Sequence, residues 1–362
     1  MQNDPEHLLE LSNGKKKLPL TDKKDILTKC IYGVDIDVHA VEVSKFSLLI
    51  KLIEDETPAS VKECVPILPD LSSNIKNGNS LICREDIHGK ELPIEVLCNI
   101  KPFEWETING GAKFDAIVGN PPYVKTEDIH TLETEEEFAV YKKKYKSAYK
   151  QFDKYFLFLE KAFDLLKEDG QMCYIVPNKF YKIGAGQELR RITAKYVSKL
   201  DDFGDMQLFP DKTIYSCIIT LCKECNKQLQ YTNVISLTDL WTGEEQENIE
   251  IKNEMLDENP WRLTTDIKFM KMIAKVEEHG KPLGEIVNIF NGIQTSAERP
   301  KPVYWFSKDE IVSEKEDEII VDKFEKRYHI EKSILKPFFK PTKEEEKGMG
   351  TYSILKTDKH II

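Results

Sequence analysis

The chain has 362 residues, of which 40% are apolar and 10% aromatic, and its formal net charge is −11. At about 150 residues per domain the length suggests two domains, and the apolar content excludes wholesale disorder. The negative charge argues against a non-specific polyanion binder but leaves room for a local basic groove. No apolar run approaches the roughly 18 residues of a membrane-spanning helix, and the start lacks the apolar stretch of a secretory signal. We therefore expect a cytoplasmic protein whose eight cysteines are reduced.

Short apolar runs alternate with amphipathic segments over the first 225 residues. Strands are predicted at 30–37, just before Gly78, and at 114–119, 172–176, 199–203 and 216–222. Helices are predicted at about 41–56, 152–167 and 186–198, with Asp169-Gly170 ending the second, whereas the charged segment 124–150 carries no strand signal. This alternation is typical of an α/β protein with a parallel sheet covered on both faces.

The composition changes after Cys225. Residues 226–262 are polar and acidic, and their apolar residues show no clear helical or strand period, so we expect a linker or insert there. A helix is predicted near 265–278, followed by apolar pieces punctuated by glycine and proline. The sequence therefore predicts one domain over 1–225 and a second over 263–362.

Asn120-Pro121-Pro122-Tyr123 follows the predicted strand at 114–119, where ligands bind in open α/β sheets. The prolines keep the backbone extended and remove two N–H donors, so that carbonyls and the Asn120 amide oxygen remain as acceptors. Two such acceptors can hold the two hydrogens of a planar NH₂ group, and Tyr123 offers a face on which a base can stack. The pattern favours chemistry on an exocyclic amine. The alternative is a proline-terminated strand with a buried asparagine.

Two polar segments follow the earlier predicted strands. Asp35, at the end of strand 30–37, can accept both hydroxyls of a ribose, and Asp37 is the expected N-cap of the next helix. Asn79 and Ser80 follow the weaker strand and could bond the amino group of an adenine. Helix capping and an ordinary turn are the alternatives for these two segments.

Three further features invite a functional interpretation. Phe209, beside Pro210, either stacks on a base that has left the duplex or tucks into the core. Cys222 and Cys225 have the spacing of half a zinc site, but no second pair lies at a suitable distance, so we expect no metal. One lysine-rich segment forms either a solvated helix face or a set of phosphate contacts: Lys142, Lys143, Lys144, Lys146 and Lys150.

Taken together, these segments resemble the gamma-class N6-adenine DNA methyltransferases of restriction–modification systems, and most of all the long type IIG-like enzymes. The resemblance rests on YGVDIDVHAVEVSKFSL, NGNSLI, FDAIVGNPPYV, QFDKYFLFLEKAFDLL and LFPDKTIYSCIITL in this order, and on KPLGEIVNIFNGIQTSAE and IEKSILKPFFK near the end. It implies a Rossmann-like class I S-adenosylmethionine-dependent methyltransferase sheet in 1–225 and a partial target-recognition domain in 263–362. It also implies S-adenosylmethionine as methyl donor and double-stranded DNA as partner.

The resemblance further implies a role for each site residue. Asp35 takes the ribose hydroxyls of the cofactor and Ile36 packs on its adenine, with Asn79 and Ser80 nearby. Phe158 forms an apolar wall of the same pocket. The target N6 amine is held by Asn120 and the Pro121 carbonyl, next to Pro122, and the flipped adenine lies between Tyr123 and Phe209.

One departure from the family pattern concerns the start of the sheet. The Gly-rich turn that follows the family's first strand is expected upstream of Gly33, and residues 1–32 do not supply it. We therefore expect an amino-terminally truncated enzyme that binds S-adenosylmethionine poorly alone, with an upstream fragment as a possible partner. The alternatives are an inactive or split-gene DNA-binding fragment, and an enzyme that methylates protein glutamine or guanine N2 in ribosomal RNA.

Overall fold

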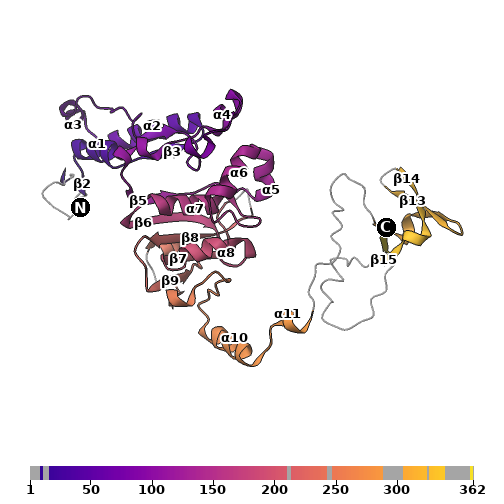
Figure 1. The fold of residues 1–362 in the computed structure, drawn as a ribbon. Coiled ribbons are helices and arrows are strands. Elements are labelled where there is room, and N and C mark those ends of the chain that lie inside the picture. The colour runs from indigo at the N-terminus through magenta and orange to yellow at the C-terminus, as the bar shows by residue number, and fades with distance from the viewer. Residues whose placement is uncertain are drawn as a thin grey trace. The chain divides into compact units, whose positions relative to one another are not determined.

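The computed structural model describes residues 9–10, 16–209, 213–242, 247–287, 305–323, 326–338 and 359–361. These residues fall into two compact units, Met1–Met272 and Ile273–Ile362, each of which is considered by itself (Figure 1). Within the described residues, no helix has the length and apolarity needed to cross a lipid bilayer.

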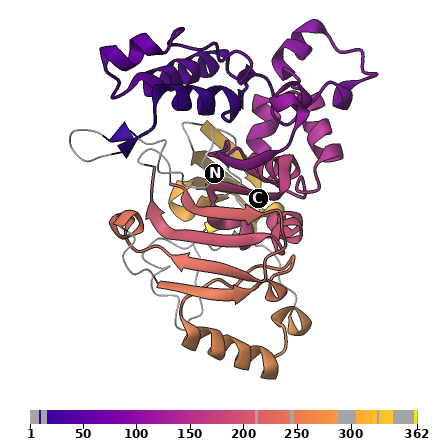
Figure 2. The same ribbon diagram turned by 90° about the vertical axis from the view of Figure 1, so that its left-hand side faces the viewer.

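A six-stranded mixed sheet forms the centre of the first unit (Figure 2). The parallel pair β5 and β6 lies at one end, and β8 runs antiparallel between β6 and β7. β9 is parallel to β7, and β10 closes the other end in antiparallel pairing. In spatial order the strands are β10 (Glu247–Lys252), β9 (Gln228–Asn233), β7 (Val197–Gln207), β8 (Tyr215–Cys222), β6 (Leu166–Pro177) and β5 (Phe114–Gly119).

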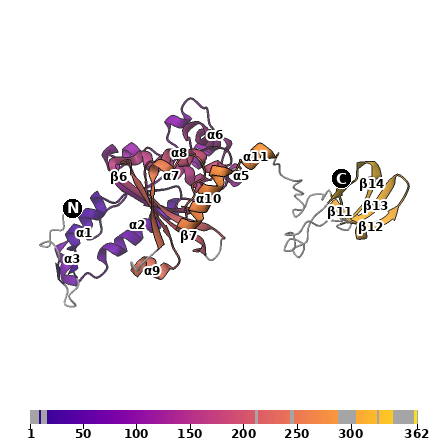
Figure 3. The same ribbon diagram turned by 90° about the horizontal axis from the view of Figure 1, so that it is seen from below.

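Helices flank this sheet (Figure 3), and they share one hydrophobic core with its strands. Phe156, Leu159 and Phe163 of α7 and Leu189 of α8 are buried in one cluster with side chains of β6, β7 and β8. The helices of this part are α4 (Ile94–Ile100), α5 (Thr126–Leu132), α6 (Glu135–Lys144), α7 (Lys154–Leu165), α8 (Gln187–Thr193) and α9 (Leu237–Thr242). α10 (Ile267–His279) begins in the first unit and continues past Met272 into the second.

A smaller parallel sheet joins β3 (Gly33–Asp35) to β4 (Ile75–Asn77). Two helices pack on it and share a separate core with Ile75: α1 (Leu20–Lys29) and α2 (Val38–Ile53). Asp37 caps α2 as predicted, because its carboxylate accepts a bond from the His39 backbone N–H. The short elements of this region are β1 (Leu9–Glu10), β2 (Lys16–Lys17) and α3 (Pro58–Glu63).

The second unit contains two small antiparallel sheets around a core of Phe306, Ile319, Val321 and Ile330. Its elements are α11 (Leu283–Ile286), β11 (Trp305–Ser307), β12 (Ile311–Glu314), β13 (Glu318–Lys323), β14 (Lys326–Glu331), β15 (Lys336–Phe338) and β16 (Lys359–Ile361). Part of the recognition-like sequence, from 288 to 298, lies outside the described residues, as does Pro210.

The α/β class is confirmed, and the strand at 114–119 is found with the predicted bounds. Residues 226–262 differ from the expected linker, since they contribute β9 and β10 to the sheet. The exposed side chains of β9 are polar and alternate with the buried Leu229 and Tyr231. The average composition of this segment is therefore polar although it forms a strand. Asp169-Gly170 was expected to end a helix but lies inside β6, because α7 already ends at Leu165.

A buried carboxylate ties β7 to its neighbours and generates a prediction about stability. Asp202 accepts bonds from the Tyr181 and Tyr231 hydroxyls and from the Asn178 amide, 2.9 Å away. Asp202→Ala removes the acceptor of the buried Tyr181 and Tyr231 hydroxyls, so we expect the free energy of unfolding to fall by about 3 kcal/mol or more.

Urea unfolding followed by circular dichroism measures this change. The matched control is Asp205→Ala at an exposed position of the same strand, with an expected effect within about 0.5 kcal/mol. Equal midpoints for the two variants would contradict the importance of the Asp202 network.

Candidate active site

The segment after β5 places an exposed carboxamide at the end of the large sheet. Gly119 pairs with Tyr174 of β6, and a Cβ at position 119 would lie 2.9 Å from the Tyr174 ring, so only glycine allows this close approach. The next residue, Asn120, is exposed, whereas Pro121 is buried. The chain therefore leaves the sheet at Gly119 and presents Asn120 to solvent.

The Tyr123 hydroxyl holds the Asn120 side chain in place. It lies 2.6 Å from the Asn120 Oδ1 atom and 3.0 Å from the Ile175 carbonyl oxygen of β6. A phenol has a single proton to donate, so this hydroxyl can bond only one of the two acceptors fully at any moment. The arrangement orients the amide oxygen while leaving Tyr123 a second acceptor.

Two aromatic rings surround Tyr123 on separate elements. The Tyr155 ring centroid lies 6.1 Å away at 83°, and the Phe209 ring centroid lies 6.4 Å away at 66°. The structure therefore brings Tyr123 and Phe209 together, from positions 86 residues apart in sequence. Both contacts are edge-to-face, the arrangement that aromatic pairs prefer, so a planar base between Tyr123 and Phe209 requires the rings to turn.

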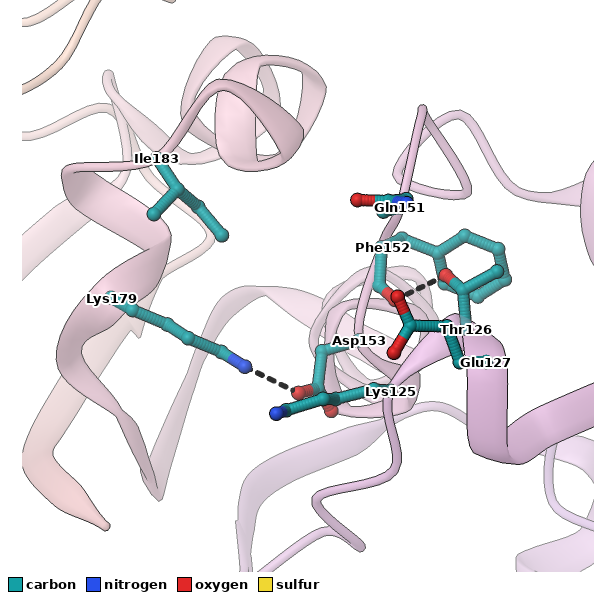
Figure 4. Close-up of a pocket in the computed structure, with 8 residues that line it drawn as sticks. All are labelled: Lys125, Thr126, Glu127, Gln151, Phe152, Asp153, Lys179 and Ile183. Carbon is teal, nitrogen blue, oxygen red and sulfur yellow. Dashed lines mark hydrogen bonds and ion pairs between the residues drawn. The ribbon is translucent and has the colours of Figure 1, made fainter. Parts of the chain in front are cut away.

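A polar cavity of about 240 Å³ adjoins this segment, and Figure 4 shows the residues that line it. The buried Asp153 carboxylate forms an ion pair with Lys179, whose Nζ atom lies 2.9 Å from Oδ2. Its other oxygen, Oδ1, is buried and has no hydrogen-bond partner in the described part of the chain. The Thr126 hydroxyl bonds the Phe152 carbonyl at 2.6 Å, which joins the start of α5 to the residues before α7. The lining residues are Lys125, Thr126, Glu127, Gln151, Phe152, Asp153, Lys179 and Ile183.

Asp35 and Ile36 lie at the end of β3. Asp35 is exposed, and its Oδ1 atom accepts the Asp37 backbone N–H at 2.8 Å. The Asn77 amide and the Lys101 ammonium both bond the Ile36 carbonyl, which fixes this turn. The result is an exposed carboxylate next to an exposed Ile36 side chain.

Asn79 is buried, and both ends of its amide have partners inside the protein. Its Oδ1 atom accepts the Leu81 N–H at 3.0 Å, and its Nδ2 donates to Glu137 Oε1 at 3.3 Å. Burial raises the pKa of Glu137, which also closes a capping box with Thr134 at the start of α6. The Thr134-to-Glu137 spacing could have predicted this helix start. The bond to Asn79 had no sequence signal.

Two other predicted residues lie in supporting positions. Phe158 is half-buried in α7 and packs against the main core. Ser80 is half-buried, and its carbonyl accepts the Trp105 indole N–H at 3.0 Å.

The lysine-rich segment divides into two groups. Lys142 donates to the Ala148 carbonyl at 2.8 Å, and Lys144 pairs with Asp86. Lys142 is exposed although its ammonium is bonded, and three further lysines of the segment are exposed: Lys143, Lys146 and Lys150.

The two cysteines of the half zinc motif, Cys222 and Cys225, lie in different environments. Cys222 lies on β8 with its Sγ atom 3.3 Å from the Ser198 hydroxyl, whereas Cys225 is exposed beyond the strand. Among the residues that the structure describes, no three His, Cys, Asp or Glu side chains converge on a metal site.

Comparison with known proteins adds an independent line of evidence. A model of the family described as Eco57I restriction-modification methylase matches residues 29–209. The type II restriction enzyme and methyltransferase RM.Eco57I of Escherichia coli is 38% identical over 369 residues, covering 100% of this chain and 35% of that enzyme. The type II methyltransferase M.BstVI of Geobacillus stearothermophilus is 39% identical over 85 residues, covering 23% of this chain and 14% of that protein. The chain thus spans about a third or less of these relatives.

Two solved structures match this chain at low sequence identity and with TM-scores below 0.5. A nuclease-deletion mutant of the type ISP restriction-modification enzyme LlaGI, in complex with a DNA substrate mimic, is 16% identical with a TM-score of 0.47, covering 70% of this chain and 23% of that chain. A type I restriction-modification methyltransferase subunit from Streptococcus thermophilus is 14% identical with a TM-score of 0.35, covering 65% of this chain and 54% of that chain.

The Tyr123 hydroxyl generates a prediction about pH. Burial, followed by the nearby Cys217 and Asp153, raises the pKa of Tyr123 from its ordinary value of 10.0 to about 12. The phenol therefore remains a donor throughout the neutral range. Its contribution to stability is fully present below pH 10 and is lost as the pH rises through about 12.

Phenolate absorbance is recorded after rapid mixing to each pH. Subtracting the absorbance of Tyr123→Phe from that of the wild type leaves the titration of Tyr123, whose midpoint is this pKa. We expect a midpoint near pH 12 for the folded protein and near pH 10 after unfolding in urea. A midpoint near 10 in the folded protein would show that the hydroxyl is not held as described.

Proposed function

Because the chain belongs to the Eco57I restriction-modification methylase family, we propose that it transfers a methyl group from S-adenosylmethionine to the N6 amine of adenine in double-stranded DNA. The observation that carries this proposal is the exposed Asn120 carboxamide, oriented by Tyr123 at the end of β5. An exposed carboxamide whose oxygen already accepts a hydrogen bond, and which lies beside aromatic rings, suits an amine on a flat ring.

The end of β3 fits the adenosine part of the cofactor. Asp35 supplies an exposed carboxylate for ribose hydroxyls, and the exposed Ile36 supplies an apolar surface for the adenine. Phe158 and the turn at Asn79 and Ser80 are the further residues we assign to this pocket. When bound, S-adenosylmethionine supplies a methyl group on a positively charged sulfur, which is already electrophilic.

The chain's own residues hold and align the target amine. Asn120 Oδ1 and the Pro121 carbonyl accept its two hydrogens, and the prolines at 121 and 122 keep these acceptors rigid. When the amine arrives, the Tyr123 hydroxyl gives up Asn120 Oδ1 and keeps the Ile175 carbonyl, 3.0 Å away. The hydroxyl already lies within hydrogen-bond distance of this second acceptor, so its release of Asn120 costs little free energy.

Tyr123 and Phe209 stabilise the base outside the duplex. Base extrusion costs a few kcal/mol, and stacking returns roughly 1–3 kcal/mol per base. The edge-to-face contact between the two rings is therefore replaced by contacts with the two faces of the adenine. After transfer the nitrogen is cationic, and it loses its proton to solvent.

Replacement of Asn120 tests the role of the carboxamide. In Asn120→Ala one acceptor of the amine is gone, so we expect methyl transfer to fall by roughly 10²–10³-fold, the usual effect of removing one preorganised group. Labelled methyl transfer to duplex DNA, followed by nucleoside analysis, measures both rate and product. The control is Asn259→Ala, an exposed asparagine remote in sequence from this segment.

The product of the reaction separates the competing functions. N6-methyladenine supports the proposal, whereas methyl groups on guanine or on protein glutamine identify a different amine substrate. DNA binding without any transfer would identify a DNA-binding fragment.

The exposed lysines of the segment after Asn120 generate a prediction about salt. If Lys143, Lys146 and Lys150 contact phosphates, changing all three to glutamine weakens binding to every DNA sequence. The slope of log affinity against log salt then becomes shallower by up to about 3.

Fluorescence anisotropy with duplex DNA at several salt concentrations measures this slope. The matched control carries the same change at three exposed lysines of α10: Lys268, Lys271 and Lys275. An unchanged slope in the first variant would assign its lysines to a solvated surface only.

A further inference from the structure

β7 has an irregular stretch shortly before Phe209. Asp202 pairs with Cys217 of β8 and Gln207 pairs with Tyr215, so β7 advances by five residues while β8 advances by two. Extra residues of this kind form a β-bulge, which bends a strand and changes the direction in which its later side chains point. Phe209 lies two residues after the end of β7, so this bulge decides where the Phe209 ring lies.

Gly204 lies within the bulge in a backbone conformation that favours glycine. Its φ is +56°, in the left-handed region, where most L side chains are strained. A Cβ atom at this position would meet no other atom within 4 Å. Glycine is therefore required here by the backbone conformation and not by a lack of space.

Asp202 and Asn178 hold the bulge from its buried side. The Gly204 N–H donates to Asp202 Oδ1 at 3.0 Å, and the Asn178 amide donates to the Gly204 carbonyl at 3.2 Å. The Asn178 amide also donates to Asp202 Oδ1 at 2.9 Å, which closes the arrangement. The two side chains are only 4% and 6% exposed. Both polar backbone groups of Gly204 thus have buried side-chain partners.

The second carboxylate oxygen fixes Asp202 itself. The Tyr181 hydroxyl donates to Oδ2, and so does the Tyr231 hydroxyl at 3.2 Å. Together with Asn178 and Gly204, four donors converge on the two oxygens of one carboxylate, which can only accept. The orientation of Asp202, and with it the acceptor for the Gly204 N–H, is therefore fixed.

The carboxyl end of β6 provides a common support for both aromatic rings of the candidate site. β6 ends at Pro177, and Asn178 follows it directly. The Ile175 carbonyl of the same strand bonds the Tyr123 hydroxyl at 3.0 Å. Tyr123 is therefore tied to β6 directly, whereas Phe209 is tied to it through Asn178 and the bulge.

We propose that Asp202 and Asn178 are positioning residues, which lock the β7 bulge and thereby set the place of Phe209 opposite Tyr123, so that the two rings accept one extruded base. Both act through Gly204, since their bonds reach its backbone and neither aromatic ring. The lock fixes the backbone before Phe209 and leaves the ring free to turn about its side-chain bonds. The part that concerns the base rests on the proposed function, whereas the locking of the bulge does not.

A fluorine label reports the position of Phe209 without DNA. The full chain is prepared with para-fluorophenylalanine at position 209 alone, and its fluorine NMR spectrum is recorded. The Tyr123 ring shifts this resonance, which is verified by its movement in Tyr123→Leu. We expect one narrow line for the otherwise unchanged protein and a displaced or broadened line in Asn178→Ala, where the bonds to Asp202 and to the Gly204 carbonyl are lost.

The matched control is Asn253→Ala. Asn253 is also a buried asparagine, and its amide donates at 2.9 Å to a carbonyl of the same strand, that of Val197. Val197 begins β7, at the end remote from Phe209. We expect Asn253→Ala to lower the urea midpoint as Asn178→Ala does while leaving the fluorine line of residue 209 in place.

Gly204→Ala tests the bulge without removing a side-chain hydrogen bond. Alanine is strained at this φ although it has room, so we expect the fluorine line to move and amide exchange over residues 203–209 to become at least fivefold faster. Asparagine tolerates the left-handed region, so Gly204→Asn is expected to keep the line in place and the exchange rate within twofold. This pair of variants decides the question if Asn178→Ala does not fold.

Labelled methyl transfer to plasmid DNA tests the role in base binding. We expect kcat to fall at least tenfold in Asn178→Ala and in Gly204→Ala, because a displaced Phe209 no longer stacks on the base. The affinity for plasmid DNA is expected to stay within twofold, since the bulge contacts no phosphate in the proposed function. Asn253→Ala and Gly204→Asn are expected to keep kcat within twofold.

The outcomes separate the lock from the proposed function. A fluorine line that stays in place in both Asn178→Ala and Gly204→Ala would overturn the inference, as would an equal displacement in Asn253→Ala. A displaced line with unchanged kcat would support the lock and contradict its role in base binding. A wild type that methylates no adenine would contradict the proposed function, while the fluorine spectra and exchange rates would still support or overturn the lock.

Discussion

The parallel pairing of β5 with β6 is the constraint on which the candidate site depends. It sets Gly119 against Tyr174, so that the chain leaves the sheet as soon as the two prolines begin. The same register places the Ile175 carbonyl within 3.0 Å of the Tyr123 hydroxyl, which in turn orients the Asn120 amide. One strand pair and two prolines therefore hold a hydrogen-bond acceptor, the Asn120 amide oxygen, at the end of the sheet.

The parts of the fold that the sequence predicted are those with a local cause. The run Phe114–Gly119, which ends one residue before two prolines, predicts both a strand and its end. Asp37 is a residue type that commonly caps helices, and it directly precedes α2. The contact between Asn79 and Glu137 spans 58 residues, and the pair formed by Asp153 and Lys179 spans 26. Such contacts depend on packing of separate elements, and no single-sequence pattern reports them.

The candidate site residues come from two separate sheets of this chain. Asp35 and the segment after β5 belong to different sheets in this chain, although the starts of β3 and β5 touch through Tyr32 and Phe114. In the proposed function, the acceptors for the target amine lie within residues 120–123, and the carboxylate for the cofactor ribose lies at the end of β3, so that two separate segments of the chain hold the two reactants.

A structure of the protein bound to duplex DNA and a cofactor analogue would reveal which groups hold the target amine. We predict an adenine outside the duplex, with its N6 atom about 3 Å from Asn120 Oδ1 and the Tyr123 hydroxyl bonded to Ile175 alone. DNA bound with every base stacked in the duplex, and with the bond from Tyr123 to Asn120 intact, would contradict it.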